Sequence, residues 1–277
     1  MLRLLWVLML APLGVLSAGD KPSLSVEEIM ARVAANQDRG QTARAEYVYQ
    51  QRIRVATLRT NGKLVREETA DYLVTPTPDG TKKQLNHIDG RYWRKGKYLE
   101  FHSEPVPEPG SLDGDLVHDF REDLSNDRSK DGLGRDLFPL TSREQKQYLF
   151  ELEGEETVQG RKVYRVRFRP RDKNELTWAG EALIDQEEFE PLRVYAKLSR
   201  KIPLFVRTLL GTDLPGLGFN VQYRRFDEGV WFPASFGTEF RLRAVFFINR
   251  DITVSLENSA FQRAKVQSKI VDFQPVK

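Results

Sequence analysis

The most regular alternation in the chain runs through Lys162-Val163-Tyr164-Arg165-Val166-Arg167-Phe168-Arg169-Pro170. In the middle of this stretch, apolar side chains occupy every second position and arginines occupy the positions between them. Successive side chains of a β-strand point to opposite faces, so a period of two predicts a strand with one apolar and one basic face. A sheet built from such strands buries one face and exposes the other to solvent.

Comparable stretches lie on both sides of this one and fill most of the chain. They occupy 47–55, 64–74, 82–93, 145–153, 177–185, 192–199, 219–226, 231–240, 243–249 and 252–257, with a less regular segment at 261–273. Asn61-Gly62 is a strong signal for a two-residue hairpin, whereas Asp89-Gly90 indicates a turn that interrupts the third strand region. Because most connections are short, we expect a mainly β (α+β) fold of about 10–11 strands in a single curved antiparallel sheet or half-open β-barrel.

Only a few segments have the patterns of a helical cover for such a sheet. Ser25 and Glu28 form a capping box, and the apolar residues that follow predict an amphipathic helix over 25–38. A second short helix is expected at about 116–125, and an apolar segment at 203–211 is the third candidate.

The N-terminus has a composition of its own. Residues 1–19 combine a basic start, a short apolar stretch broken by Pro12 and the small residues Ser17-Ala18-Gly19, which predicts a cleaved secretory signal peptide. The alternative, a membrane anchor, would need about 20 uninterrupted apolar residues. Residues 20–277 contain no Gly/Ser linker and are expected to form one domain, with a polar connection or insertion at about 103–140.

The composition excludes several classes of function. The chain has 277 residues, 40% of them hydrophobic and 30% charged, and its net charge is +3, so neither disorder nor a multispan membrane protein fits. Basic residues are offset by acidic ones, so no nucleic-acid partner is expected. The chain has no cysteine, which excludes disulfides, thiol nucleophiles, cysteine-ligated metals and N-terminal lipidation.

No motif supports catalysis. Residues 127–132 resemble the start of a calcium loop, but Phe138 stands where that loop needs an acidic ligand. His87, His102 and His118 have no partner at metal-ligand spacing, and no nucleophile elbow or phosphate loop is present. We therefore predict no catalytic residues, no metal and no cofactor, and we expect that the protein is not an enzyme.

Arginines recur on the face of the strands opposite the apolar side chains. They are Arg52, Arg54, Arg165, Arg167, Arg169, Arg193, Arg224, Arg241 and Arg243. The favoured interpretation is an outer, solvated sheet face, where long basic side chains also discourage edge pairing. The alternative is a basic wall that attracts anionic lipid headgroups.

The apolar face is the remaining candidate site. The residues predicted to line it and to bind lipid are Tyr47, Tyr49, Ile53, Val55, Tyr164, Val166, Phe168, Leu192, Val194, Phe219, Val221 and Phe236. The residues of a candidate lid are Leu204, Phe205, Leu209 and Leu210. A long curved sheet with few covering helices can leave a lipid-sized cavity, and the alternative is a fully packed core.

The order of these elements resembles a known family. An amphipathic helix precedes long aromatic-containing strands, and residues 156–170 enter a strand through a glycine turn. Gly180-Glu181-Ala182-Leu183-Ile184-Asp185 then ends in Ile-Asp, and Pro191-Leu192-Arg193-Val194 begins another alternating strand. This succession, which spans most of residues 25–275, resembles the exported LolA-like proteins of outer-membrane lipoprotein sorting.

The resemblance implies a half-open antiparallel barrel with a helical lid, whose apolar interior receives acyl chains. It implies a periplasmic, non-catalytic carrier with lipid or lipoprotein acyl chains as partners. The alternative of a different class is an envelope sensor of the same fold that binds a membrane protein or lipoprotein partner. The polar stretch 103–140 and the length of the C-terminal strands depart from the family pattern, so no lid-contacting residue is transferred from it.

Overall fold

A computed structural model describes residues 24–77, 80–103, 111–125, 140–172, 177–199, 212–213, 217–226, 229–244 and 248–264. The helices in these ranges are α1 (Val26–Arg44), α2 (Leu112–Ser125) and the short 3₁₀ helix η1 (Glu144–Gln147). The strands are β1 (Tyr47–Leu58), β2 (Leu64–Thr77), β3 (Gly80–Arg94), β4 (Lys97–Phe101), β5 (Tyr148–Val158), β6 (Arg161–Pro170), β7 (Trp178–Asp185), β8 (Pro191–Leu198), β9 (Thr212–Asp213), β10 (Gly218–Arg225), β11 (Trp231–Ala244) and β12 (Ile248–Arg263).

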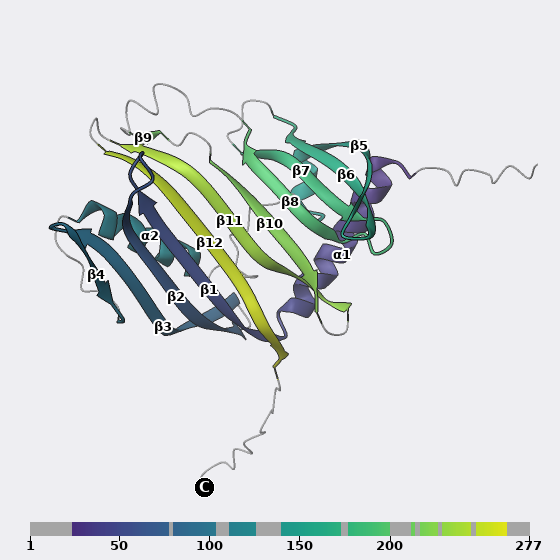
Figure 1. The fold of residues 1–277 in the computed structure, drawn as a ribbon. Helices are drawn as coiled ribbons and strands as arrows, with labels where there is room; N and C mark the ends of the chain where they lie inside the picture. The colour runs from purple at the N-terminus through teal and green to yellow at the C-terminus, as the bar shows by residue number, and fades with distance from the viewer. Residues whose placement is uncertain are drawn as a thin grey trace, which may run out of the picture.

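The strands form one curved antiparallel sheet (Figure 1). Their order is β4-β3-β2-β1-β12-β11-β10-β8-β7-β6-β5, and the two-residue β9 pairs with β11 beside this path. The chain therefore closes the middle of the sheet by pairing its first strand with its last, along most of the length of β1. The predicted fold class, a mainly β protein with one open, curled antiparallel sheet, is confirmed.

Both α-helices lie on the same face of the sheet, behind it in the view of Figure 1. Their apolar residues Ile29, Val33 and Val117 belong to the same buried cluster as the inward side chains of the strands. The other face carries no helix in the described part of the chain. We call the face toward the helices the inward face and the opposite one the outward face.

Helix α1 begins as the sequence predicts. The Ser25 hydroxyl accepts a hydrogen bond from the Glu28 N–H, and the Glu28 carboxylate accepts one from the Ser25 N–H, which completes the capping box. The helix continues to Arg44 instead of ending at about residue 38. Tertiary contacts stabilise this extra length, because Arg44 is buried and its guanidinium donates to the carbonyl oxygen of Trp231 at 3.0 Å.

The predicted strand boundaries need four corrections. β3 runs without interruption through Asp89-Gly90, where Gly90 permits a close approach: a Cβ there would lie 2.1 Å from the Phe101 ring. β4 was not foreseen. The segments 231–240 and 243–249 are not separate strands, because β11 is continuous to Ala244 and β12 already begins at Ile248. The last segment, 261–273, is misplaced at its start, because Phe261 still belongs to β12, and its residues 265–273 lie outside the described residues.

The polar stretch 103–140 contains helix α2, which is longer than expected and begins at Leu112. Asp113 and Asp115 stand in its first turn, where negative charge complements the positive end of the helix. The remainder of the stretch, 104–110 and 126–139, lies outside the described residues, as does the signal-peptide prediction. The division of the chain into these segments stays a prediction.

Candidate functional site

One row of apolar side chains crosses the inward face through ten strands. Direct pairing partners run Leu152, Val166, Ala182, Val194, Val221, Phe236, Leu256, Ile53, Ala70 and Ile88. All but Leu152 are buried, and Leu152 packs against the same cluster. Five residues of the predicted lining set, Val166, Val194, Val221, Phe236 and Ile53, stand in this single row.

Five further predicted lining residues lie beside the row on the same face. Phe168 and Phe219 pair with Gly180 and Ala196, and the Trp178 ring packs edge-on against Phe219 with centroids 4.7 Å apart. Val55, Tyr164 and Leu192 complete the group. Tyr164 and Leu192 are half-buried and pack at its margin, whereas the others are buried.

Tyr47 and Tyr49 lie apart from this group, in an aromatic cluster at the beginning of β1. Tyr47 meets the Phe232 ring edge-on and Tyr49 stacks on Phe261, each at a centroid distance of 5.1 Å. Phe226 contacts both partner rings. The structure thus brings ten of the twelve predicted lining residues together and places two elsewhere. The lid residues Leu204, Phe205, Leu209 and Leu210 lie outside the described residues.

The inward face also contains buried charges under α2, which the sequence analysis missed. The Arg66 guanidinium donates to the Glu68 carboxylate at 2.7 Å, and Arg121 of α2 forms an ion pair with the same carboxylate at 3.4 Å. Arg121 also donates to the Tyr72 hydroxyl at 3.0 Å. The available signal was the parity of β2, which puts Arg66 and Glu68 on the face of Ala70.

A second polar contact holds the start of α2 to the sheet. Arg250 of β12 forms a bidentate ion pair with Asp113, with distances of 2.7 and 3.0 Å. At the other end of the helix, the Lys83 ammonium donates to the carbonyl oxygen of Leu124 at 2.6 Å. Partly buried polar contacts of this kind orient α2 over the sheet, since a polar group that is removed from water costs free energy if its partner is lost.

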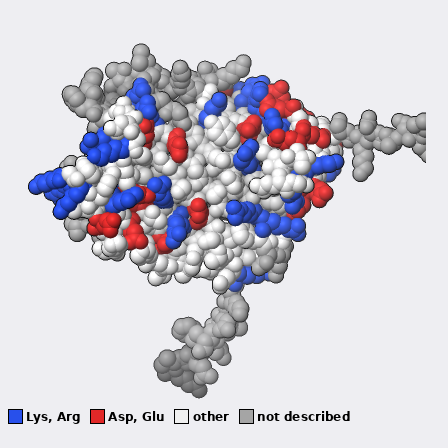
Figure 2. Space-filling model, viewed as in Figure 1, with Lys and Arg blue, Asp and Glu red and all other residues white. Residues whose placement is uncertain are grey.

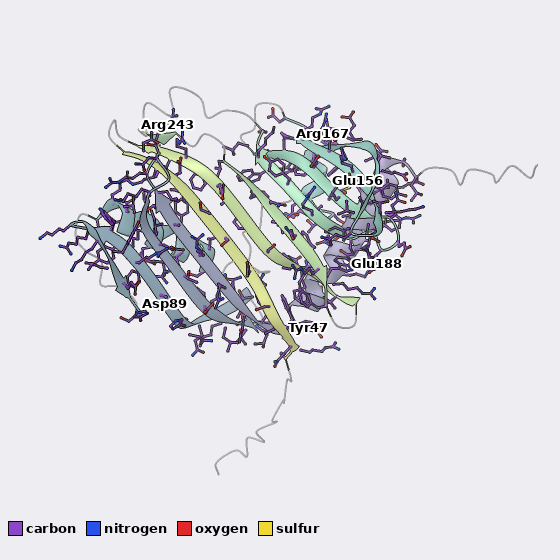
Figure 3. All side chains as sticks on the ribbon, viewed as in Figure 1. Tyr47, Asp89, Glu156, Arg167, Glu188 and Arg243 are labelled. Carbon is purple, nitrogen blue, oxygen red and sulfur yellow. The ribbon has the colours of Figure 1, made fainter. Side chains whose placement is uncertain are left out.

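The predicted arginines point outward, but they do not form a basic wall. Five have carboxylate partners, in the pairs Arg52–Asp71, Arg54–Glu67, Arg165–Glu156, Arg167–Glu153 and Arg241–Asp251. Figure 2 shows red among the blue on this face, with charge gathered over the two ends of the sheet. In Figure 3, Arg167 beside Glu156 and the distant Arg243 lie at different places on the sheet. The solvated outer face is the interpretation that agrees with this arrangement.

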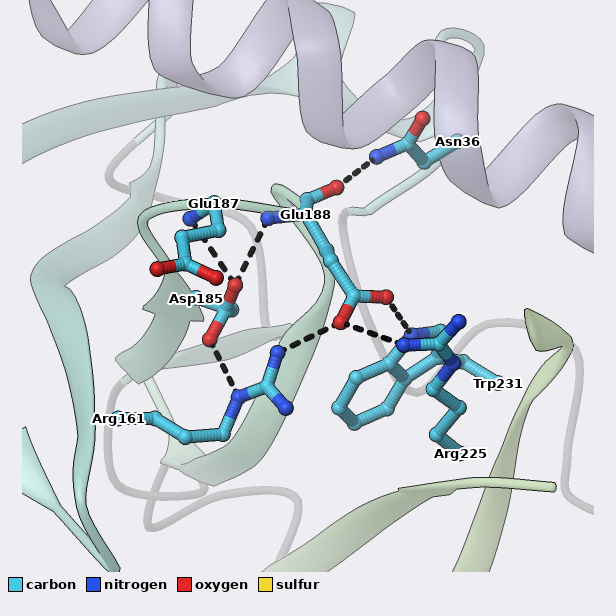
Figure 4. A network of polar contacts seen from close by, with 7 residues as sticks. All are labelled: Asn36, Arg161, Asp185, Glu187, Glu188, Arg225 and Trp231. Carbon is cyan, nitrogen blue, oxygen red and sulfur yellow. Dashed lines mark hydrogen bonds and ion pairs between the residues drawn. The ribbon is translucent and has the colours of Figure 1, made fainter.

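Helix α1 is attached to the turn between β7 and β8 (Figure 4). The Asn36 side chain donates to the carbonyl oxygens of Glu188, at 2.6 Å, and Phe189, at 3.1 Å. The Glu188 carboxylate accepts from the Trp231 indole at 2.9 Å and from Arg161 at 2.6 Å. This network, which sequence reasoning missed, joins α1, two neighbouring hairpins and β11.

The turn itself is shaped by Asp185. Its carboxylate accepts the backbone N–H groups of Glu187 and Glu188 at 3.0 and 2.7 Å, and it pairs with Arg161 at 2.6 Å. Burial acts to raise the pKa of Asp185, but these hydrogen bonds outweigh it and hold the pKa below its ordinary value. Phe189 adopts a positive φ of 54° in this turn and stacks on Tyr164.

Glu190 follows the turn and has an unusual environment. Its carboxylate accepts a hydrogen bond from the buried Gln37 of α1 at 2.6 Å. Burial raises the pKa of Glu190 to about 7, against the opposing effects of Arg44 and the Gln37 hydrogen bond. A carboxyl group that titrates near neutral pH therefore lies directly under α1.

A further polar cluster combines two histidines with one aspartate. His87 and His102, which have no common sequence motif, both contact the Asp89 carboxylate at 2.6 Å, and these contacts lower the pKa of Asp89. All three side chains are exposed. Among the described residues, no group of three or more His, Cys, Asp or Glu side chains is arranged to hold a metal ion. No helix in the described ranges is long and apolar enough to cross a membrane.

Comparison with known proteins gives matches among solved structures alone. No family model matches the chain, and no curated protein matches it. A DUF1329 family protein from Desulfovibrio piger is 14% identical, with 90% of this chain and 95% of that chain covered and a TM-score of 0.37. A LolA superfamily protein from Nitrosomonas europaea is 11% identical, covers 90% and 97%, and has a TM-score of 0.35.

The lipoprotein LppX from Mycobacterium tuberculosis is also similar, at 11% identity, with 88% and 100% of the two chains covered and a TM-score of 0.24. A LolA superfamily member among the matches agrees with the resemblance seen in the sequence. These TM-scores are below 0.5, so the fold class rests on the strand order of this chain and the function proposed below rests on its own geometry.

Proposed function

We propose that this protein is an exported, non-catalytic carrier that binds lipid or lipoprotein acyl chains between its inward sheet face and the covering helices. The observation that carries the proposal is the apolar row through ten strands. In the described part of the chain, two α-helices, α1 and α2, are available to cover a sheet face of that width, so an acyl chain can complete the cover. The bound lipid would contact the predicted lining residues around this row, and the periplasm is the proposed compartment.

Polar anchors explain how such a cover could open. The helices are attached by hydrogen bonds and ion pairs, from Asn36 on α1 and from Asp113 and Arg121 on α2. The side chains beneath them are buried, so an acyl chain must displace a helix and replace its apolar contacts with the sheet. Each buried CH₂ contributes about 0.8 kcal/mol, so a long acyl chain can offset the loss of those contacts. Anchors made of polar groups can then be re-formed when the lipid leaves.

A photoactivatable fatty acid tests the proposal directly. We expect the protein to be labelled by a diazirine-bearing palmitate, and Leu192→Gln to lower labelling several-fold, because it puts an amide on the inward face of β8. Leu192 is half-buried, so this variant disturbs packing less than a change in the row itself. The matched control is Arg193→Gln, which alters the outward face of the same strand and should label like the unchanged protein.

Two results would contradict the carrier. One is labelling no stronger than that of the heat-unfolded protein. The other is equal labelling of both variants while circular dichroism shows them folded. Native mass spectrometry of protein purified from an exporting host should in addition find co-purified lipid. A stable protein partner without lipid, recovered by pull-down, would favour the envelope sensor instead.

A further inference from the structure

The outward face has a hollow over the middle strands of the sheet, on the side opposite the proposed lipid site. It has a volume of about 450 Å³ and lies over β8, β10, β11 and β12. Tyr195, Asn220, Gly237 and Ser255, which line it, are successive direct pairing partners across these four strands. The hollow therefore follows one cross-strand row and is not a gap between elements.

Glycine creates the hollow. A Cβ added at Gly237 would have no atom within 4 Å, so the space above this residue is open where every neighbour in the row has a side chain. Gly218 also lines the hollow, from β10. The three inward-pointing residues Phe219, Thr238 and Val254 lie at alternate positions and complete the lining from below. Its volume is in the range of small-molecule sites.

Aromatic and polar side chains form the walls. Tyr195 is 44% exposed, so its ring is available beside the hollow. Thr253 and Ser255 contribute hydroxyl groups, and Asn220 contributes an amide whose buried Oδ1 has no hydrogen-bond partner among the described residues. The carboxylate of Glu239 stands on the same side and, in the part of the chain that the structure describes, has no ion pair, unlike Glu67 or Asp251.

This chemistry selects among classes of ligand. None of the ten lining residues is basic and one is acidic, so an anion such as a phosphate is not favoured. Hydroxyls, an amide and a carboxylate would be desolvated without partners by an acyl chain, which excludes one on energetic grounds. A neutral molecule with many hydroxyl groups and one apolar surface fits both the polar side chains and the aromatic ring that line the hollow. Its hydroxyls can exchange hydrogen bonds with the polar side chains while its C–H surface packs on the tyrosine ring.

We propose that this hollow binds a sugar unit of an oligosaccharide. The ring of Tyr195 is the platform, Gly237 provides the space, and Asn220, Glu239, Thr253 and Ser255 provide the hydrogen bonds. The site lies on the outward face, so a sugar and an acyl chain would bind on opposite sides of the same sheet.

Saturation-transfer NMR with three separate probes, maltotriose, cellotriose and tri-N-acetylchitotriose, tests this inference. We expect at least one of them to bind the unchanged protein. Gly237→Val should abolish that signal by filling the hollow, and its Cβ meets nothing, so the sheet should stay folded. Tyr195→Ser should weaken binding roughly three- to tenfold, the range expected from loss of an aromatic contact. Arg193→Ser, two positions away on the same face of β8, is the matched control and should bind normally.

The inference is overturned if none of the three sugars binds, or if Gly237→Val and Tyr195→Ser bind the sugar as the unchanged protein does. It is also overturned if Gly237→Val loses labelling by the fatty-acid probe, because the hollow would then belong to the lipid site. Retained fatty-acid labelling in Gly237→Val supports two separate sites. Since Leu192→Gln tests the inward face alone, the failure of either proposal can be distinguished from the failure of the other.

Discussion

Glu190 is the residue whose environment most directly links packing to solution conditions. It lies after the β7–β8 turn, contacts Gln37 of α1, and has its pKa raised to about 7 by burial. The folded protein therefore holds a proton that the unfolded chain, with an ordinary glutamate, releases at lower pH. The stability that comes from this group is complete below the ordinary glutamate pKa and decreases as the pH rises toward 7.

We predict that Glu190→Gln flattens the pH dependence of unfolding between about pH 5 and about pH 8. The unchanged protein should lose on the order of 2–3 kcal/mol from this group across that window, and the variant, which keeps an acceptor for Gln37, should not. Urea unfolding at a series of pH values measures the difference. Glu187→Gln, exposed in the same turn, is the control, and equal pH profiles for all three proteins would contradict the prediction.

At the scale of elements, helix α1 is attached to the sheet at a small number of places. Its apolar residues Ile29 and Val33 pack on the sheet, whereas its C-terminal half is positioned by Asn36, Gln37 and Arg44. These three residues contact the β7–β8 turn and β11, which are far from α1 in sequence. A helix attached in this way can open locally without unfolding the sheet beneath it.

Asn36→Ala should therefore accelerate hydrogen exchange in α1 and leave the central strands unchanged. The variant removes two hydrogen bonds to backbone carbonyls, each contributing about 1 kcal/mol, so exchange in α1 should rise roughly thirtyfold. Hydrogen-exchange mass spectrometry resolves the two regions. Thr42→Ala, at an exposed position of the same helix, should have no such effect. A uniform increase in exchange over α1, β1 and β12 would contradict the prediction, because α1 would then open together with the sheet and not on its own.

At the scale of the molecule, the outward face determines how the protein meets a membrane. Its nine predicted arginines are distributed over β1, β6, β8, β10 and β11, and five of them are paired with carboxylates. A guanidinium and a carboxylate in an ion pair cancel one another's field within a few ångströms of the surface. This face therefore offers little attraction to anionic headgroups.

We predict that the protein sediments with phosphatidylcholine vesicles and with vesicles containing added phosphatidylglycerol to the same small extent. Because no basic wall exists on the described outward face, lowering the salt concentration should not change this result. A marked preference for the phosphatidylglycerol vesicles that is lost at high salt would contradict it. Such a result would restore the interpretation of the arginines as a headgroup-binding surface.

Local patterns were sufficient to predict the sheet and many of the residues on its inward face. The alternation in β6 assigned Val166 and Phe168 to the buried face without any knowledge of their neighbours, because the period of a strand is a property of the backbone. The capping box at Ser25 likewise depends on residues three positions apart. Patterns of this kind survive in the folded chain because tertiary contacts act in the same direction.

What depends on distant residues could not be predicted in the same way. Gly90 indicated a turn in the sequence. The structure shows instead that a strand continues there, because the Phe101 ring lies against the Gly90 backbone. No sequence pattern singled out Asn36 or Arg121, because their partners Glu188 and Glu68 are far away in sequence. The hollow over Gly237 depends on the register of four strands, and no periodicity within one strand records that register.

The sequence by itself determined most of the strands, their apolar face and the start of α1, because a two-residue period and a helix cap arise from contacts along the chain. The tertiary structure alone decided the pairing of β1 with β12, the ion pairs of five outward arginines, and the raised pKa of Glu190 beneath α1. Each of these depends on distances between residues that are far apart in the chain, and those distances exist only once the sheet has formed.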